Sequence, residues 1–276
     1  MKDKRIIHID FDRKELNKVF DVDIPTYYDL GLALPELITK CLSKQKVSFP
    51  KNNFNRPYKK NHSGASVRYF LEHMFEYLPT KSNIISDIGE FMTYIIKYLP
   101  IRKDMNFEIS TNYAAMGNAV GGAVGACLST PDYQTVIVMG DGGFFMNGME
   151  ILTAREYNLP IIYVIINNAT LGFVTNGQKV LFGKTNEPSM QKRIEISEML
   201  KAIGIPGITI RENEDLPKII DVVSNLNGPC IIELATDNTE QSPFMDRLLM
   251  LKELYSSTAT LEQGHDKAKT ETGDYA

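Results

Sequence analysis

The chain has 276 residues, of which 43% are apolar and 23% charged, so it is long enough to bury one large α/β core or two modest ones. A formal net charge of -4, with Lys and Arg scattered along the chain, gives no general attraction to nucleic acid, which we do not expect as a partner. The apolar runs are too short to span a bilayer and the amino-terminal segment has no apolar signal-peptide core, so a cytoplasmic protein without membrane contact is expected.

The first 65 residues hold few periodic elements. A short strand is predicted at 5–10 and a helix with apolar spacing at 30–42. The stretch 43–65 is basic, rich in Asn and punctuated by Pro, which predicts a linker. Residues 1–42 therefore hold too few elements for a complete domain.

From residue 66 onward, helices alternate with short β-branched runs, a pattern typical of a parallel sheet with helices on both faces. We assign 66–245 to this main domain and 246–276 to a polar, disordered tail that opens with a short helical piece. A loop is expected between residue 166 and residue 194. The predicted strands are 83–86, 135–139, 161–166, 207–210 and 229–234. The predicted helices are 67–77, 88–98, 117–128, 146–157, 194–203 and 216–226.

The three cysteines, Cys41, Cys127 and Cys230, are odd in number, widely spaced and without a CxxC pair. This pattern is not that of a disulfide framework or a zinc site. We interpret all three as small core residues.

The candidate site residues lie in two loops. The strand at 135–139 runs directly into GDGG, and the strand at 161–166 runs directly into NN. In a right-handed βαβ unit both loops emerge at the carboxyl edge of the sheet, so Asp141 and Asn168 face one crevice. A carboxylate oxygen, an amide oxygen and a backbone carbonyl just beyond form half of the octahedral oxygen shell that Mg²⁺ prefers.

The glycines in the first loop fit the same interpretation. Gly142 and Gly143 have no side chains, so their N–H groups at a helix start can approach and hold a phosphate. GDGG alone is more often a turn, and NN alone is more often the end of a strand. Their combination at neighbouring strand ends predicts a site for magnesium and a diphosphate.

The segment from Gly140 to Asn168 resembles the signature of thiamine-diphosphate-dependent enzymes, the family of acetolactate synthase, pyruvate decarboxylase and benzoylformate decarboxylase. The resemblance implies thiamine diphosphate and Mg²⁺ as cofactors. It implies Asp141, Asn168 and the carbonyl of Thr170 as metal ligands. It also implies that Gly140 binds the cofactor, in addition to Gly142 and Gly143.

The resemblance extends to both sides. In NYAAMGNAVGGAVGA, Met116 falls on the residue that bends the cofactor into its V shape, and the carbonyl of Ala114 on the acceptor for its 4′-amino group. In LGFVTNGQ, which resembles the loop covering the cofactor in acetolactate synthase, Gly172 would lie near the diphosphate and Phe173 near the reacting carbon. Gly177 replaces a bulky aromatic residue, so substrate preference does not transfer. The alternatives are a core-filling Met116 and a mobile surface loop.

One departure concerns the segment DIGEFM. Asp87 and Gly89 keep the family pattern, but Glu90 and Phe91 stand where acetolactate synthase has a Gln-His pair at the diphosphate. A carboxylate there would be repelled unless it is protonated, paired with lysine or turned away. Glu90 either acts on the substrate as a catalytic residue or is a solvated surface side chain.

The resemblance covers residues 1 to about 245. Residues 1–42 look like the last strand and closing helix of the family's central domain, and are interpreted as a remnant of it. The pyrimidine-binding domain, whose glutamate activates the cofactor, has no counterpart in the sequence. We therefore expect a subunit of a split enzyme, forming a hetero-oligomer with a second subunit that carries the pyrimidine-binding domain.

The expected activity is decarboxylation of a 2-oxo acid, pyruvate first among them, with transfer of the acyl unit to a second carbonyl. One alternative is a subunit of a nonoxidative 2-oxo acid decarboxylase. Another is a noncatalytic remnant that acts as an assembly or regulatory partner. The acceptor substrate and the binding of FAD are left open by the sequence.

Overall fold

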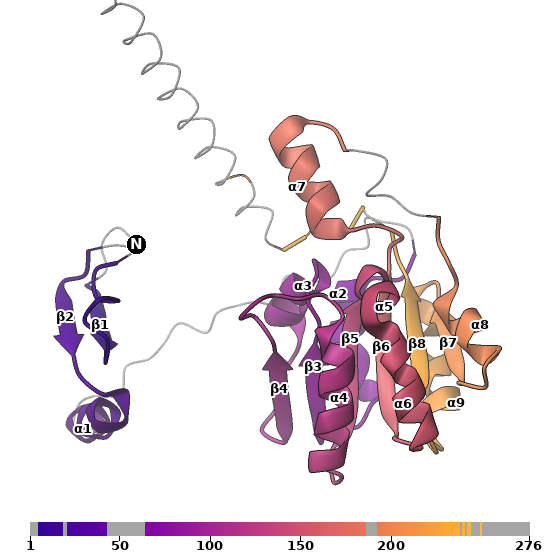
Figure 1. Ribbon diagram of the computed structural model, residues 1–276, viewed down its shortest axis with the longest axis horizontal. Coiled ribbons are helices and arrows are strands. Elements are labelled where there is room, and N and C mark those ends of the chain that lie inside the picture. Colours follow the sequence, from indigo (N-terminus) through magenta and orange to yellow (C-terminus); the bar gives the residue numbers. More distant parts are fainter. Residues whose placement is uncertain are drawn as a thin grey trace, which may run out of the picture. The chain divides into compact units, whose positions relative to one another are not determined.

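A computed structural model describes residues 5–18, 21–42, 64–185, 192–237, 239–240, 242–243 and 249. The chain divides into two compact units, Met1–Pro57 and Tyr58–Ala276 (Figure 1). The predicted linker, except for Gly64 and Ala65, and the predicted tail, except for Leu249, lie outside the described residues. The domain boundaries given above stay predictions.

The smaller unit pairs two short parallel strands, β1 (Ile7–Asp10) and β2 (Ile24–Tyr27), with Ile7 opposite Ile24. Helix α1 (Leu30–Leu42) follows and has the predicted bounds. β2 was not predicted, because a four-residue strand that contains Pro25 shows no apolar alternation.

The larger unit is built on a six-stranded sheet in the order β4-β3-β5-β6-β8-β7, and every described pairing is parallel. β5 and β6 lie at its centre and pair from Thr135 opposite Ile161 to Gly140 opposite Ile166. The strands are β3 (Ser82–Ser86), β4 (Met105–Ile109), β5 (Gln134–Gly140), β6 (Ile161–Asn167), β7 (Gly207–Ile210) and β8 (Cys230–Ala235).

Helices cover both faces of this sheet, as predicted (Figure 1). Along β5 the side chains alternate between two cores: Ile137 and Met139 pack on one face, and Val136 and Val138 on the other. The first face carries α4 (Asn118–Ser129), α5 (Asp141–Asn147), η2 (Gly148–Glu150), α6 (Ile151–Glu156) and α8 (Ile196–Lys201). The second carries α2 (Val67–His73), η1 (Met74–Glu76), α3 (Phe91–Tyr98), η4 (Asn213–Ile219) and α9 (Ile220–Val223).

Three predictions about elements of this unit were wrong. β4 was missed although its apolar residues alternate with the exposed Asn106 and Glu108, because a five-residue edge strand gives only a short signal. The helix predicted at 146–157 is three shorter pieces, and the first begins at Asp141, directly after β5. The predicted loop after β6 contains α7 (Gly172–Phe182), which lies above the carboxyl ends of the strands in Figure 1.

α7 has a sequence of low helix propensity, with two glycines and the β-branched Val174 and Thr175. Tertiary contacts stabilise it instead. Thr175 is buried and its hydroxyl lies 2.7 Å from that of Thr170, and the Asn176 amide donates to Glu90. Glu90 is distant in sequence, and the contact with Thr170 depends on the turn before the helix, so helix propensity gave no indication of α7.

All three cysteines are free. Cys127 and Cys230 are buried, as predicted, but Cys41 is exposed, because α1 buries few of its side chains within the described part of its unit. Among the described residues, no helix combines the length and the apolar character needed to cross a membrane.

Candidate functional site

A pocket opens at the carboxyl edge of the sheet, where β5 and β6 end side by side. Most of the residues that the sequence selected lie in its wall. They are Glu90, Met116, Gly140, Asp141, Gly142, Asn168, Thr170, Gly172 and Phe173. Ala114 and Gly143 are not among its lining residues. The two predicted loops thus lie together in the pocket wall, as expected for loops that follow neighbouring parallel strands.

Asp141 begins α5 and is only 4% exposed. Burial raises the pKa of its carboxyl group to about 6, against the opposing effects of backbone N–H donors at Gly142 and Ala169 and the charge of Arg193. No Lys, Arg or His in the described part of the chain forms an ion pair with it. The position fits a bound divalent cation, which would stabilise the charged form that burial disfavours.

Asn168 and Thr170 flank a sharp turn. Ala169 between them has a φ of 54°, in the left-handed region that few residues with a side chain adopt. The Oδ1 of Asn168 accepts a hydrogen bond from the backbone N–H of Thr170 at 3.2 Å. The turn therefore holds both residues in the pocket wall beside Asp141.

The glycines after Asp141 are required by their surroundings. A Cβ on Gly142 would lie 2.7 Å from Cδ2 of Leu171 and 3.4 Å from Cε of Met116. A Cβ on Gly143 would overlap Oδ2 of Asp87. Because neither glycine has a side chain, the backbone at Gly142 is open to the pocket. The backbone at Gly143 packs tightly against Asp87.

Asp87 positions the segment that carries Met116. Its buried carboxylate accepts hydrogen bonds from the backbone N–H groups of Gly117 at 2.8 Å and Ala119 at 3.4 Å, at the start of α4. Burial raises the pKa of Asp87, and these backbone donors oppose that effect. Met116 is half-buried in the pocket wall, while Ala114 is exposed and has a φ of 50°.

Glu90 lies in the pocket wall rather than on a solvated surface. Its Oε1 accepts a hydrogen bond from the side-chain amide of Asn176 in α7 at 2.6 Å, and its Oε2 occupies the space where a Cβ of Gly172 would lie. Burial raises the pKa of Glu90, opposed by hydrogen bonds from Asn176 and Ser242 and by the charge of Lys179. The Glu90 carboxylate is therefore turned toward α7.

The sequence did not identify the segment after β8 as part of the site. Thr236, Asp237 and Glu240 line the same pocket. The Glu240 carboxylate accepts hydrogen bonds from Ser66 Oγ and Val67 N, both at 2.8 Å, and so caps the start of α2. An acidic residue after the last strand gives no local signal of such a distant partner.

The fold and the site together define a parallel α/β domain with an acidic, glycine-bordered pocket at its carboxyl edge. Residues 87–234, more than half of the chain, match the family model of the thiamine pyrophosphate enzyme, C-terminal TPP binding domain. The chain belongs to this family. The prediction of an acetolactate synthase-like C-terminal part is thereby confirmed.

Similar proteins agree with this assignment. The chain is 26% identical over 251 residues to the acetolactate synthase large subunit of Lactococcus lactis, covering 87% of this chain and 43% of the relative. It is 25% identical over 241 residues to the acetolactate synthase isozyme 2 large subunit of Escherichia coli, covering 85% and 44%. The chain thus spans less than half the length of these relatives.

A solved structure supports the fold. The thiamine diphosphate-dependent 4-hydroxybenzoylformate decarboxylase of Rhodococcus jostii RHA1 superposes with a TM-score of 0.69 at 19% identity. The match covers 86% of this chain and 45% of that one.

Proposed function

We propose that this chain binds thiamine diphosphate and Mg²⁺ in the pocket between the ends of β5 and β6. Asp141, the side chain of Asn168 and the carbonyl of Thr170 hold the metal ion. The observation that carries the proposal is the buried Asp141 carboxylate, which forms no ion pair among the described residues and lies beside glycine backbone. Family membership supports it.

The other pocket residues take the roles that the family resemblance implies. Met116 supports the bend between the two cofactor rings, which brings the reacting groups together, and the carbonyl of Ala114 accepts from the 4′-amino group. Backbone at Gly140, Gly142 and Gly172, which line the pocket, surrounds the diphosphate, and the resemblance implies the same role for Gly143, which lies just behind this wall. Phe173, which is 39% exposed, lines the pocket and limits access of water to the reacting carbon.

The reaction we propose is decarboxylation of a 2-oxo acid, pyruvate first among them, with transfer of the acyl unit to a second carbonyl. The chemistry that the cofactor supplies when bound is stabilisation of a carbanion at the former carbonyl carbon. The support is that the two relatives described above are acetolactate synthase large subunits. Product analysis with pyruvate, with and without an aldehyde or ketone acceptor, distinguishes carboligation from release of an aldehyde.

We further propose that the carboxylate that activates the pyrimidine comes from a second subunit, in a hetero-oligomer. The support is that the carboxylates lining this pocket have other partners. Glu90 binds Asn176, Glu240 caps α2, and Asp237 accepts from the N–H of Thr239 at 2.8 Å. Asp141 is assigned to the metal ion.

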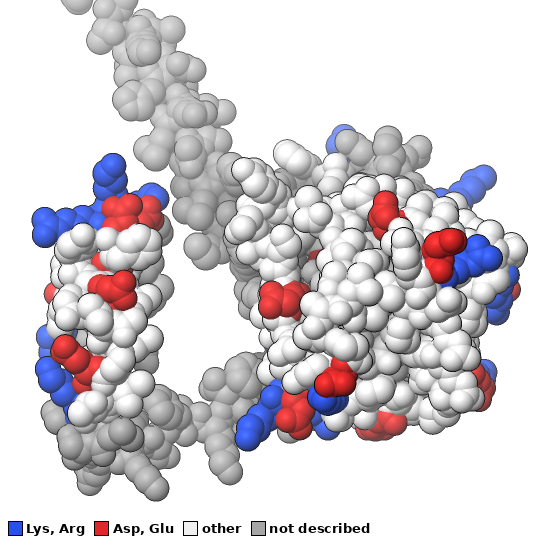
Figure 2. Space-filling view, turned by 60° about the horizontal axis from the view of Figure 1, so that its bottom comes forward, with Lys and Arg blue, Asp and Glu red and all other residues white. Residues whose placement is uncertain are grey.

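An uncovered apolar surface near the pocket fits such a partner. Phe145 and Met146 of α5 and Met149 of η2 are 42%, 55% and 56% exposed. On the neighbouring α4, Gly121 and Gly125 are exposed and have open space where side chains would be, so another polypeptide could approach the backbone closely. Figure 2 shows a face of the larger unit on which a broad uncharged area separates groups of charged residues.

Calorimetry with the full chain tests cofactor binding. Thiamine diphosphate with Mg²⁺ is expected to bind the wild type, and Asp141→Ala is expected to abolish the Mg²⁺-dependent heat. No binding by the wild type, alone or with a polypeptide carrying a pyrimidine-binding domain, would refute the proposal. Robust pyruvate consumption by this chain alone would refute the requirement for a second subunit.

A further inference from the structure

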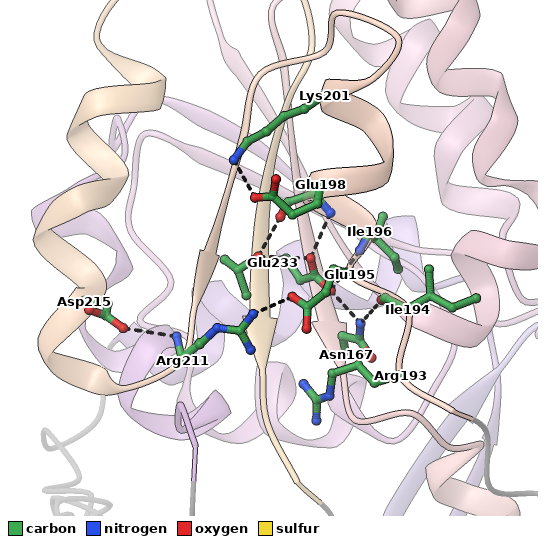
Figure 3. A network of polar contacts seen from close by, with 12 residues as sticks. Asn167, Arg193, Ile194, Glu195, Ile196, Glu198, Lys201, Arg211, Asp215 and Glu233 are labelled. Carbon is green, nitrogen blue, oxygen red and sulfur yellow. Dashed lines mark hydrogen bonds and ion pairs between the residues drawn. The ribbon is translucent and has the colours of Figure 1, made fainter.

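A fully buried carboxylate lies beside the proposed metal site without lining its pocket. Glu233 in β8 is 0% exposed, and β8 lies between β6 and β7 in the sheet. Its Oε1 accepts hydrogen bonds from the Asn167 side-chain amide at 2.5 Å and from Ile196 N at 3.2 Å. Its Oε2 accepts from Ser197 N at 2.8 Å and from the Thr209 hydroxyl at 3.3 Å. Figure 3 shows Glu233 at the centre of this network.

This arrangement fixes the orientation of the Asn167 amide. All four partners of Glu233 are uncharged donors, so the side of Asn167 that faces it must be the NH₂ group. The same NH₂ group also donates to the carbonyl of Ile194 at 2.8 Å. With both amide hydrogens directed this way, the Oδ1 of Asn167 points to the backbone N–H of Ala169, from which it accepts at 3.3 Å.

The bond from Ala169 N reaches the proposed metal ligands. Ala169 is the residue with φ of 54°, and Asn168 and Thr170 stand on either side of it. A left-handed residue with a side chain is unfavourable in isolation and persists only where surrounding contacts hold it. Asn167 supplies such a contact, and the backbone N–H of Thr236 binds the Asn167 carbonyl at 3.1 Å and fixes the other end of the residue.

We propose that Glu233 is a positioning residue of the metal site. By accepting from Asn167, it orients the amide that holds the turn at Ala169, and so sets the direction of Asn168 and of the Thr170 carbonyl. This inference rests on the proposed function, because it assigns those two residues to the metal ion. It also explains why a carboxylate, and not an apolar residue, stands in the middle of a buried strand.

The same carboxylate has a second, purely structural task, which supplies the control. Its Oε2 fastens β7 and the start of α8 through Thr209 and Ser197, on the side away from Asn167. Thr209→Val removes a donor from Oε2 and leaves every contact of Asn167 in place. A lower stability is therefore expected for variants on either side of the Glu233 carboxylate. A lower metal affinity is expected only for variants on the Asn167 side.

The test measures Mn²⁺ binding, as a probe for Mg²⁺, by electron paramagnetic resonance on the full chain with saturating thiamine diphosphate. Glu233→Gln is nearly isosteric, and its NH₂ group is expected on the Oε1 side, because the Ser197 N–H at 2.8 Å opposes it more closely than the Ile196 N–H at 3.2 Å. The Asn167 amide then has to turn, which breaks its bond to Ala169. We expect Mn²⁺ to bind about tenfold more weakly, the lower end of the effect of residues that contact metal ligands, because Glu233 acts through Asn167. Thr209→Val is expected to lower Tm and leave Mn²⁺ affinity unchanged.

Asn167→Ala completes the design. It is expected to weaken Mn²⁺ binding as Glu233→Gln does, and the double variant is expected to be no weaker than either single one, because both changes break the same chain of contacts. Should Glu233→Gln not fold, equal Mn²⁺ affinities for Asn167→Ala and Thr209→Val would overturn the proposal. Unchanged affinity in a folded Glu233→Gln protein would overturn it while leaving the proposed function intact. Absence of Mn²⁺ binding to the wild type, both alone and with a polypeptide carrying a pyrimidine-binding domain, would overturn both.

Discussion

Replacing Asp141 by Asn should stabilise the protein in the absence of ligands while destroying the proposed metal site. Burial raises the pKa of this carboxyl group from 3.8 to about 6 in the folded chain. The folded state therefore holds the proton more tightly than the unfolded state, and stability is lost as pH rises between the two pKa values. Linkage at about 1.4 kcal/mol per pKa unit gives a destabilisation of about 1 kcal/mol at pH 4.5 and about 3 kcal/mol at pH 7.5.

The assay is urea unfolding of wild type and Asp141→Asn, without Mg²⁺, across this pH range. The amide loses part of the interaction with the backbone donors at Gly142 and Ala169, and this loss is the same at every pH. The quantity to follow is therefore the free energy of unfolding of the variant minus that of the wild type, which should increase by about 2 kcal/mol from pH 4.5 to pH 7.5. A difference that does not change with pH would refute the reasoning. Added Mg²⁺ and thiamine diphosphate should stabilise the wild type alone.

Two further predictions concern backbone positions around the pocket. Gly172→Ala should destabilise the chain by about 1–3 kcal/mol in urea unfolding, because its Cβ would overlap the Glu90 carboxylate. Gly177→Ala, in the same helix but facing open space, is the matched control and should stabilise the chain by up to about 1 kcal/mol. Equal destabilisation by the two substitutions would contradict the predicted overlap with Glu90. Ala114→Gly should raise stability by about 1 kcal/mol, since a φ of 50° strains alanine, and an unchanged or lower Tm would show that the strain is absent.

The central strands and the two loops of the site could be predicted from the sequence because their signals are local. β5 and β6 consist mainly of β-branched residues and end in Gly140 and Asn167, and the handedness of parallel crossovers places both ends at one edge. Nothing beyond neighbouring residues and a general topological rule was needed. The helices on both faces of a parallel sheet follow from the same pattern, whereas the strand order, which includes the unpredicted β4, was not predicted.

The parts that could not be predicted depend on partners far away in the sequence. α7 is held by the distant Glu90, with help from the nearby Thr170, rather than by its own propensity. Glu90 could be interpreted as a surface residue because its partner Asn176 lies in that unrecognised helix. Glu240 and the start of α2 are separated in sequence by almost the whole domain, and no periodicity in either segment predicts their contact.

The antiparallel bridge between Gly64 and Thr236 has a wider consequence. With the bond from Ala65 N to the Ala235 carbonyl at 3.2 Å, it places the start of the segment 64–236 directly against its end. This segment is therefore a module whose two ends adjoin, beside the pocket that Thr236 lines. Such a module can be joined to different neighbouring polypeptides, or have its ends exchanged by permutation, without rethreading any strand.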